Sequence, residues 1–231
     1  MRSHKITKKS GEAEMRRYDD ACGTAHALEL LGDRWALLIL RELMLGARRF
    51  SQLRADLPRL SANVLTQRLG ELERRGLLLH RTLPPPASVP VYELTPWGYE
   101  TEPITQAMGR WAARSPHHDA SLRISGVSLL LSFRTMLDRQ RAKGIDAEVG
   151  FRFGDDVYRG HLTPSLFAIS QGDPDDAQLV FIGSPMVLGA AVHGGVPISK
   201  LEKAGALTVI GDRKLAQRFT TLFPLPEKLP T

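Results

Sequence analysis

The chain has 231 residues, of which 42% are hydrophobic and 24% are charged, and its formal net charge is +6 at pH 7. This is the composition of an ordinary globular protein with one or two domains, and no apolar run approaches the roughly 20 residues that a membrane helix needs. We expect neither a membrane span nor a secretory leader, because the basic start of the chain is followed by no apolar segment. The single cysteine, Cys22, excludes an internal disulfide and favours a reducing, cytoplasmic setting.

The excess of positive charge lies in the first half of the chain. Residues 1–115 carry 18 Lys and Arg against 13 Asp and Glu, whereas residues 116–231 carry 13 against 12. A basic half suits an anionic polymer such as nucleic acid, although a charge that only keeps the protein in solution gives the same count. Charge alone does not decide between these two interpretations.

The chain opens with a tail and two helices. Residues 1–17 are polar and charged, and they predict a mobile basic tail. Apolar residues recur at helical spacing from Thr24 onward. Gly32 and Asp33 are expected to divide this stretch into two helices, the second ending at Gly46.

A pair of short helices and a hairpin follow. Ser51 is expected to cap a short helix that ends at Pro58, and Ser61 to cap a second helix that ends at Gly76. After Gly76 the pattern changes to strands, with prolines placed where they interrupt no ladder. The expected elements are strands at 77–83 and 91–95, joined by the proline-rich segment 84–90, and then a helix at 97–114.

The helix that begins at Ser61 has an apolar face and a face of mostly short, neutral hydrogen-bonding groups. Leu65, Leu69 and Leu72 recur at helical spacing, while the other face carries Asn63, Thr66, Gln67, Gly70 and Arg74. Such amide, hydroxyl and guanidinium groups are those that read base edges in the major groove.

Two short helices with a tight turn and a hairpin predict a winged helix-turn-helix over residues 18–114, in which the second helix of the pair enters the major groove. Arginines around the first helix would then position the protein on phosphates, and the wing at 80–92 would add contacts. Each of these side chains taken alone is also consistent with a solvated surface. The candidate DNA contacts are Arg48, Arg49, Gln52, Arg54, Ser61, Ala62, Asn63, Thr66, Gln67, Arg74, His80 and Arg81.

The second half predicts a different arrangement. Residues 115–123 form a short polar linker, and residues 124–231 form a separate domain. Strands that run together before the helices favour an α+β domain with a mostly antiparallel sheet. The expected order is a helix at 124–143, strands at 147–153, 157–163, 166–172 and 177–183, helices at 184–194 and 197–204, a strand at 207–211 and a helix at 212–223, capped by Asp212.

Residues 22–114 resemble the HxlR-type winged-helix transcriptional regulators of bacteria. The resemblance rests on Cys22 and on four segments in the right order, which are ALELLGDRWALLILREL, LMLGARRFSQL, LSANVLTQRLGELERRGLL and YELTPWG. It implies a homodimeric, cytoplasmic DNA-binding regulator, expected to be a repressor, that reads a near-palindromic operator in double-stranded DNA. The dimer contact would be built from the first helix and the helix that ends at Trp111.

Residues 124–223 more faintly resemble the sterol-carrier-protein-like fold, on the segments GDDVYRGHLT, LVFIGSPMVLGAAVHGG and KAGALTVIGDRKLAQRF. That resemblance implies an apolar pocket for a small-molecule effector. The candidate pocket residues are Phe133, Met136, Phe151, Phe153 and Met186, and each of them is also an ordinary core residue by type.

Cys22 permits two interpretations. It stands where many members of the resembled family carry a cysteine, some of which sense oxidants, and such a role needs an exposed thiol with a lowered pKa. Because it lies next to the apolar first helix, we favour the alternative of a small buried hydrophobic residue.

No motif in the chain predicts catalysis. The adjacent residues 117–119, His-His-Asp, lie in the linker with no second cluster to complete a metal site, and the chain has no phosphate loop or paired-carboxylate motif. We therefore expect no enzyme activity, no metal and no cofactor. The alternative to a regulator is a lipid or small-molecule carrier whose winged domain serves assembly, which a salt-sensitive affinity for duplex DNA would exclude.

Overall fold

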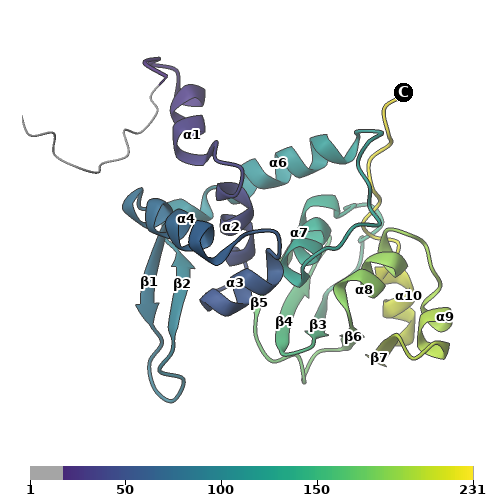
Figure 1. Cartoon of the computed structure of the whole chain (residues 1–231). Coiled ribbons are helices and arrows are strands. Elements are labelled where there is room, and N and C mark those ends of the chain that lie inside the picture. The colour runs from purple at the N-terminus through teal and green to yellow at the C-terminus, as the bar shows by residue number, and fades with distance from the viewer. Residues whose placement is uncertain (1–17, 231) are drawn as a thin grey trace, which may run out of the picture.

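The computed structural model describes residues 18–230, in which a group of helices with a hairpin precedes a group built on a sheet (Figure 1). The predicted tail at residues 1–17 lies outside the described residues. The elements of the first group are α1 (Gly23–Leu31), α2 (Ala36–Leu43), α3 (Phe50–Asp56), α4 (Ala62–Arg74), β1 (Leu78–Thr82), β2 (Pro90–Leu94), α5 (Pro96–Tyr99) and α6 (Glu102–Ala113).

Several helix boundaries lie where the sequence places them. Gly32 and Asp33 separate α1 from α2, and a Cβ on Gly32 would lie 2.3 Å from the Leu28 carbonyl oxygen. The Ser61 hydroxyl accepts a hydrogen bond from the Val64 amide and caps α4. Gly76 follows α4 with a φ of +74°, a conformation that favours glycine. These predictions are confirmed. Each boundary is set by an interaction within a few residues of it, which the sequence alone displays.

Three predicted boundaries are wrong. Ser51 does not cap α3, which begins one residue earlier, where the Gln52 side chain accepts a hydrogen bond from the Arg49 amide. The single helix predicted at 97–114 is two helices, because Pro103 in the first turn of α6 has no amide to continue a helix from α5. The helix predicted at 124–143 ends at Met136, and the Asp138 amide instead donates to the Leu222 carbonyl.

The second group is a five-stranded sheet with helices. Its order is β5-β4-β3-β6-β7, in which β3 pairs in parallel with β6 and the other neighbours are antiparallel. The elements are α7 (Gly126–Met136), β3 (Ala147–Phe153), β4 (Asp156–Leu162), β5 (Phe167–Gln171), β6 (Leu179–Gly183), α8 (Pro185–Val192), α9 (Ile198–Lys203), β7 (Leu207–Gly211) and α10 (Arg213–Phe219).

Aromatic rings fill the space between the sheet and the helices α7 and α10. Phe133 on α7 stacks on Phe223 with ring centroids 4.7 Å apart, and Phe219 on α10 lies 5.1 Å from Phe181 on β6. Phe151 on the central strand β3 contacts several of the same rings. These five rings are all at most 1% exposed, so this region is a packed core.

The two groups share one continuous core. Buried residues from Ala36 through Phe223 form a single cluster, because α7 packs against both α2 and α6. The predicted division into domains at 18–114 and 124–231 stays a prediction, and the core shows no gap there. Within residues 18–230, no helix is both long and apolar enough to cross a membrane.

Candidate nucleic-acid interface

Helix α4 presents a polar face to solvent. Its apolar face is fixed by Leu65, Leu69 and Leu72, each at most 1% exposed, which pack into the core behind it. Residues spaced three or four apart share a face of a helix, so this packing turns the opposite face outward. The exposed residues there are Asn63, Thr66, Gln67 and Arg74, with Ser61 exposed at the cap and Ala62 half-buried in the first turn.

Two polar side chains of this face form hydrogen bonds within the same helix. The Thr66 hydroxyl donates to the Ala62 carbonyl over 3.0 Å, and the Gln67 amide nitrogen donates to Glu71 over 3.0 Å. The Gln67 amide oxygen and one amide hydrogen stay open to solvent-side partners. The face can therefore both accept and donate hydrogen bonds, which is what base-edge recognition needs.

Exposed arginines surround this face. Arg49, Arg54 and Arg74 are exposed, as is Arg59 in the turn between α3 and α4. Among residues 18–230, none of these four forms an ion pair. The sequence reasoning missed Arg59, although a cation between Pro58 and Ser61 in the helix-turn-helix turn was a usable signal.

An open groove lies beside these arginines. Its volume is about 710 Å³, and it runs along α3 to the start of α4. Basic and hydroxyl side chains line it together with apolar ones, namely Phe50, Ser51, Arg54, Ala55, Pro58, Arg59, Leu60 and Ser61. A groove with two free guanidinium groups suits an anionic ligand such as a phosphate backbone.

The wing carries little free charge. His80 on β1 is exposed and stacks on Tyr92 of β2, with ring centroids 4.6 Å apart. Arg81 is exposed but forms an ion pair with Glu93 on the neighbouring strand. A phosphate would have to compete with that carboxylate for Arg81, so the wing is a weaker electrostatic contributor than the arginines around α3 and α4.

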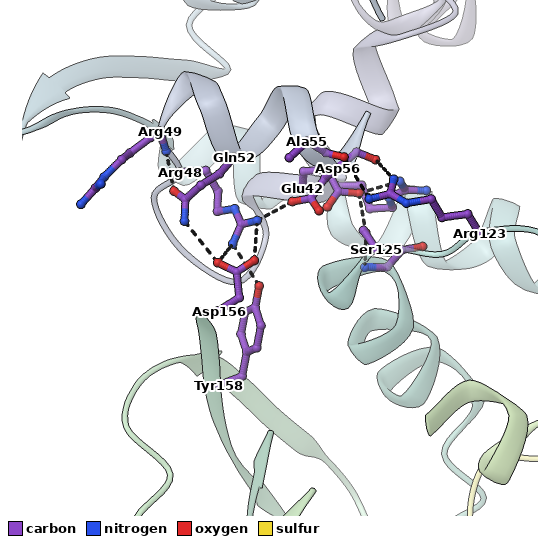
Figure 2. A network of polar contacts seen from close by, with 12 residues as sticks. Glu42, Arg48, Arg49, Gln52, Ala55, Asp56, Arg123, Ser125, Asp156 and Tyr158 are labelled. Carbon is purple, nitrogen blue, oxygen red and sulfur yellow. Dashed lines mark hydrogen bonds and ion pairs between the residues drawn. The ribbon is translucent and has the colours of Figure 1, made fainter. Parts of the chain in front are cut away.

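Arg48 is not available to DNA, and its prediction as a phosphate contact is corrected. The residue is 1% exposed and its guanidinium points into the junction between α3 and β4 (Figure 2). It donates to Asp156 Oδ2 over 2.9 Å, to the Tyr158 hydroxyl over 3.1 Å, and to Asp56, and its Nη1 forms an ion pair with Asp156 Oδ1 at 2.8 Å. Two carboxylates compensate one buried cation here.

Gln52 belongs to the same junction. Its side-chain oxygen accepts from the Arg49 amide over 2.9 Å and its nitrogen donates to Asp156 over 3.2 Å (Figure 2). The predicted phosphate contact is corrected for Gln52 as well, because this half-buried amide is already engaged at both ends. The sequence could not show this, since Asp156 lies 104 residues away.

Burial and neighbouring charges shift the pKa values of Arg48 and Asp56 in the junction and of Glu42 on α2. Burial opposes the charge of Arg48, but the neighbouring Tyr158, Asp156 and Asp56 raise the pKa of its guanidinium above the ordinary value. Burial raises the pKa of Asp56, although the positive charge of Arg48 acts in the opposite direction. Burial also raises the pKa of Glu42 on α2, whose Oε1 accepts from Ser125 over 2.9 Å while its Oε2 has no hydrogen-bond partner among residues 18–230.

Cys22 is exposed, so the favoured expectation of a buried residue is wrong for the single chain. It stands at the N-cap of α1, a helix that projects from the body and buries only Ala25 (Figure 1). Hydrogen bonds from the Ala25 and Thr24 backbone lower the pKa of the Cys22 thiol.

The five candidate pocket residues do not form a pocket. Phe133 and Phe151 are fully buried among other rings, and Met136 is 6% exposed. Phe153 packs at the rim of the same core beside Tyr158, whereas Met186 is 36% exposed on α8. The prediction of an apolar cavity lined by these residues is corrected, because the neighbouring phenylalanines fill the space it would need.

A smaller cavity of about 280 Å³ lies elsewhere in the second group, beside the Glu202–Arg213 ion pair. It is lined by residues of the α8–α9 segment and of α10, which are Ala191, Gly195, Val196, Pro197, Ile198, Ser199, Glu202, Arg213, Ala216, Gln217 and Thr220. None of the five predicted residues lines it or the groove beside α3.

Comparison with known proteins finds relatives for the first group. The family model described as HxlR-like helix-turn-helix matches residues 30–119. The HTH-type transcriptional regulator YvaP of Bacillus subtilis strain 168, itself described as uncharacterised, is 38% identical over 86 residues, which are 37% of this chain and 80% of YvaP. The HTH-type transcriptional regulator YodB of the same organism is 36% identical over 86 residues, 37% of this chain and 77% of YodB. The solved reduced form of YodB is matched over 42% of this chain and 98% of that one, at 33% identity and a TM-score of 0.38.

Proposed function

Because this chain belongs to the family of HxlR-like helix-turn-helix proteins, whose relatives found here are HTH-type transcriptional regulators, we propose that it is a sequence-specific DNA-binding regulator. The observation that carries the proposal is the exposed polar face of α4 with four arginines around it that form no ion pair among residues 18–230. The polar face would read bases in the major groove, and the arginines would hold phosphates.

The contacts of the proposed reader differ from those expected at first. Asn63, Thr66 and Gln67 are the candidate base-reading residues. Ser61 and Ala62 lie at the start of α4, where the helix would approach the sugar-phosphate backbone of the DNA. Phosphate contacts fall to Arg49, Arg54, Arg59 and Arg74, with His80 and Arg81 at the margin on the wing. Arg48 and Gln52 have no direct part in it.

The proposal includes a homodimer. Apolar side chains of α1 and α6 are exposed in the single chain, with Leu28 at 51%, Ile104 at 44%, Met108 at 51% and Trp111 at 76%. A set of exposed apolar groups of this size is typical of an interaction surface. A two-fold dimer would read a near-palindromic operator with half-sites about one helical turn apart, and by occupying that DNA it would repress.

The proposal also covers the effector and the cellular location of the protein, for which the structure gives less support. The resemblance of residues 124–223 to the sterol-carrier-protein-like fold stays a prediction, and so does an apolar effector bound in that half of the chain. Cys22 stays a candidate redox residue within the proposal, since its thiol is exposed. A regulator of this kind would work in the cytoplasm, where bacterial DNA lies.

The test is selection of bound duplexes from a random pool, followed by salt titration on the selected sequence. If the four free arginines of each protomer all contact phosphate, the slope of log affinity against log salt should approach about −7 for a dimer. Gln67→Ala should lose about 1–3 kcal/mol and relax one base position. Gln217→Ala on α10 is the matched control, because Gln217 is exposed on the other group. No enrichment and no salt dependence would favour the carrier alternative instead.

A further inference from the structure

The helix-turn-helix is held at both ends of α3 by residues that lie beyond the family match at 30–119. At the first end, Arg48 and Gln52 reach Asp156 on β4. At the other end, Arg123 donates to the Ala55 and Asp56 carbonyls over 2.9 and 3.2 Å. The sheet and the segment that precedes α7 therefore contact opposite ends of the first helix of the proposed DNA-reading pair (Figure 2).

Arg48 also connects this junction to the wing. Its backbone exchanges two hydrogen bonds with Tyr92 of β2, each 2.9 Å long. The side chain of Arg48 is fixed by β4 while its backbone fixes β2 and the start of α3. One residue thus ties the wing, the helix-turn-helix and the sheet together.

A backbone contact strengthens the same connection. The Gln171 amide at the end of β5 donates to the Leu45 carbonyl over 2.9 Å, just before the segment that carries Arg48. Gly46 has a φ of +141°, and a Cβ there would lie 2.9 Å from the Gln171 side chain. The positive φ favours glycine at this point of the loop, which lies beside the Gln171 side chain at the sheet edge.

We propose that the five-stranded sheet is a working part of the DNA reader, in which Asp156 and Tyr158 are positioning residues that set the placement of α3 and the wing. The inference rests on the proposed function and deepens it, because the reader would depend on residues outside the matched family region. A change in the sheet could then alter DNA affinity without any contact to DNA.

The physical reason is the burial of the junction. Arg48 is buried, so its Nη1 and Nη2 groups keep hydrogen-bond partners only if Asp156, Tyr158 and Asp56 keep their places. If Asp156 loses its charge, the guanidinium keeps one carboxylate partner, and α3 loses the restraint at its first turn. The second helix of the pair, α4, packs against the same core, so the placement of α3 relative to α4 would become less fixed.

The experiment compares Asp156→Asn and Tyr158→Phe with the control Arg152→Met in the full chain. Arg152 lies on β3 opposite Val157, and its side chain pairs with Asp173 and Asp175 rather than with Arg48, Asp156 or Tyr158. Two measurements are made, which are affinity for the selected duplex and for a scrambled duplex, and hydrogen exchange of the α3 and β2 amides. The milder Tyr158→Phe, which removes one hydroxyl, serves if Asp156→Asn fails to fold.

Asp156→Asn is expected to weaken specific binding by about tenfold, within the usual range of a coupling between sites, with little change on the scrambled duplex. It should also speed exchange at the amides of α3 and β2, and Tyr158→Phe should do both to a smaller extent. Arg152→Met should do neither.

Unchanged exchange at α3 and β2 in both junction variants overturns the inference, as does a loss of binding that Arg152→Met shares equally. If the wild-type chain selects no duplex, the proposed function fails, and the exchange measurement still decides whether the sheet holds α3 and the wing.

Discussion

Replacement of Arg48 by methionine tests how much the ion pairs of the junction contribute to the free energy of unfolding. Methionine keeps much of the length and volume of the side chain but removes its charge and all its donors. The carboxylates of Asp56 and Asp156 then face each other with no cation between them, and the Tyr158 hydroxyl loses its partner.

The expected size of the effect follows from the burial of the groups left behind. Removing one partner of a buried ion pair costs about 3–5 kcal/mol, because an uncompensated charge stays buried. The side chains of Asp56 and Asp156 are 14% and 27% exposed, so water can reach them in part. We therefore expect Arg48→Met to lower the free energy of unfolding by about 3 kcal/mol, at the lower end of that range.

The pH dependence adds a second criterion. Burial raises the pKa of Asp56, and loss of the nearby guanidinium raises it further. A carboxyl whose folded pKa lies above its unfolded value destabilises the fold once it ionises, and protonation relieves the cost. The deficit of Arg48→Met relative to the wild type should therefore be larger at pH 8 than at pH 5.

The assay is urea unfolding followed by circular dichroism at a fixed protein concentration, with Arg152→Met as the control. The carboxylates that face Arg152 are each 71% exposed, so this control should lose less than about 1 kcal/mol. A loss in Arg48→Met as small as that of the control, or one that does not vary with pH, would refute the view that the junction is a buried charge cluster.

Two further predictions concern other buried or exposed groups. Glu42→Gln should become more stable relative to the wild type as the pH rises from 5 to 8 in the same unfolding assay, because burial raises the pKa of Glu42 and the ionised form carries a penalty that glutamine lacks; a constant difference across that range would contradict it. Trp111→Ala should shift the protein from dimer toward monomer in sedimentation equilibrium, since Trp111 is 76% exposed on α6 in the single chain; Trp97→Ala, another exposed tryptophan of the same group, is the control, and equal behaviour of both variants would show that the dimer contact lies elsewhere.

The local elements of the first group could be predicted from the sequence because short-range interactions determine them. Ser61 caps α4 through an amide three residues away, and Gly32 and Gly76 break helices at their own positions. The leucine spacing of α4 shows which face is buried, so the exposed polar face follows without a structure. The same segments carry the family resemblance that the comparisons confirm.

What only the tertiary structure decided are the contacts between residues distant in the chain. The sequence presents Arg48 and Arg49 as two equal surface cations, yet one is buried against Asp156, 108 residues away, and the other is exposed. The sequence cannot tell whether the phenylalanines of the second group line a cavity or fill a core, because both environments are apolar. Only their mutual packing shows that they fill a core. Composition and periodicity report which side chains avoid water, whereas the partner that a buried charge or ring meets is set by how the whole chain packs.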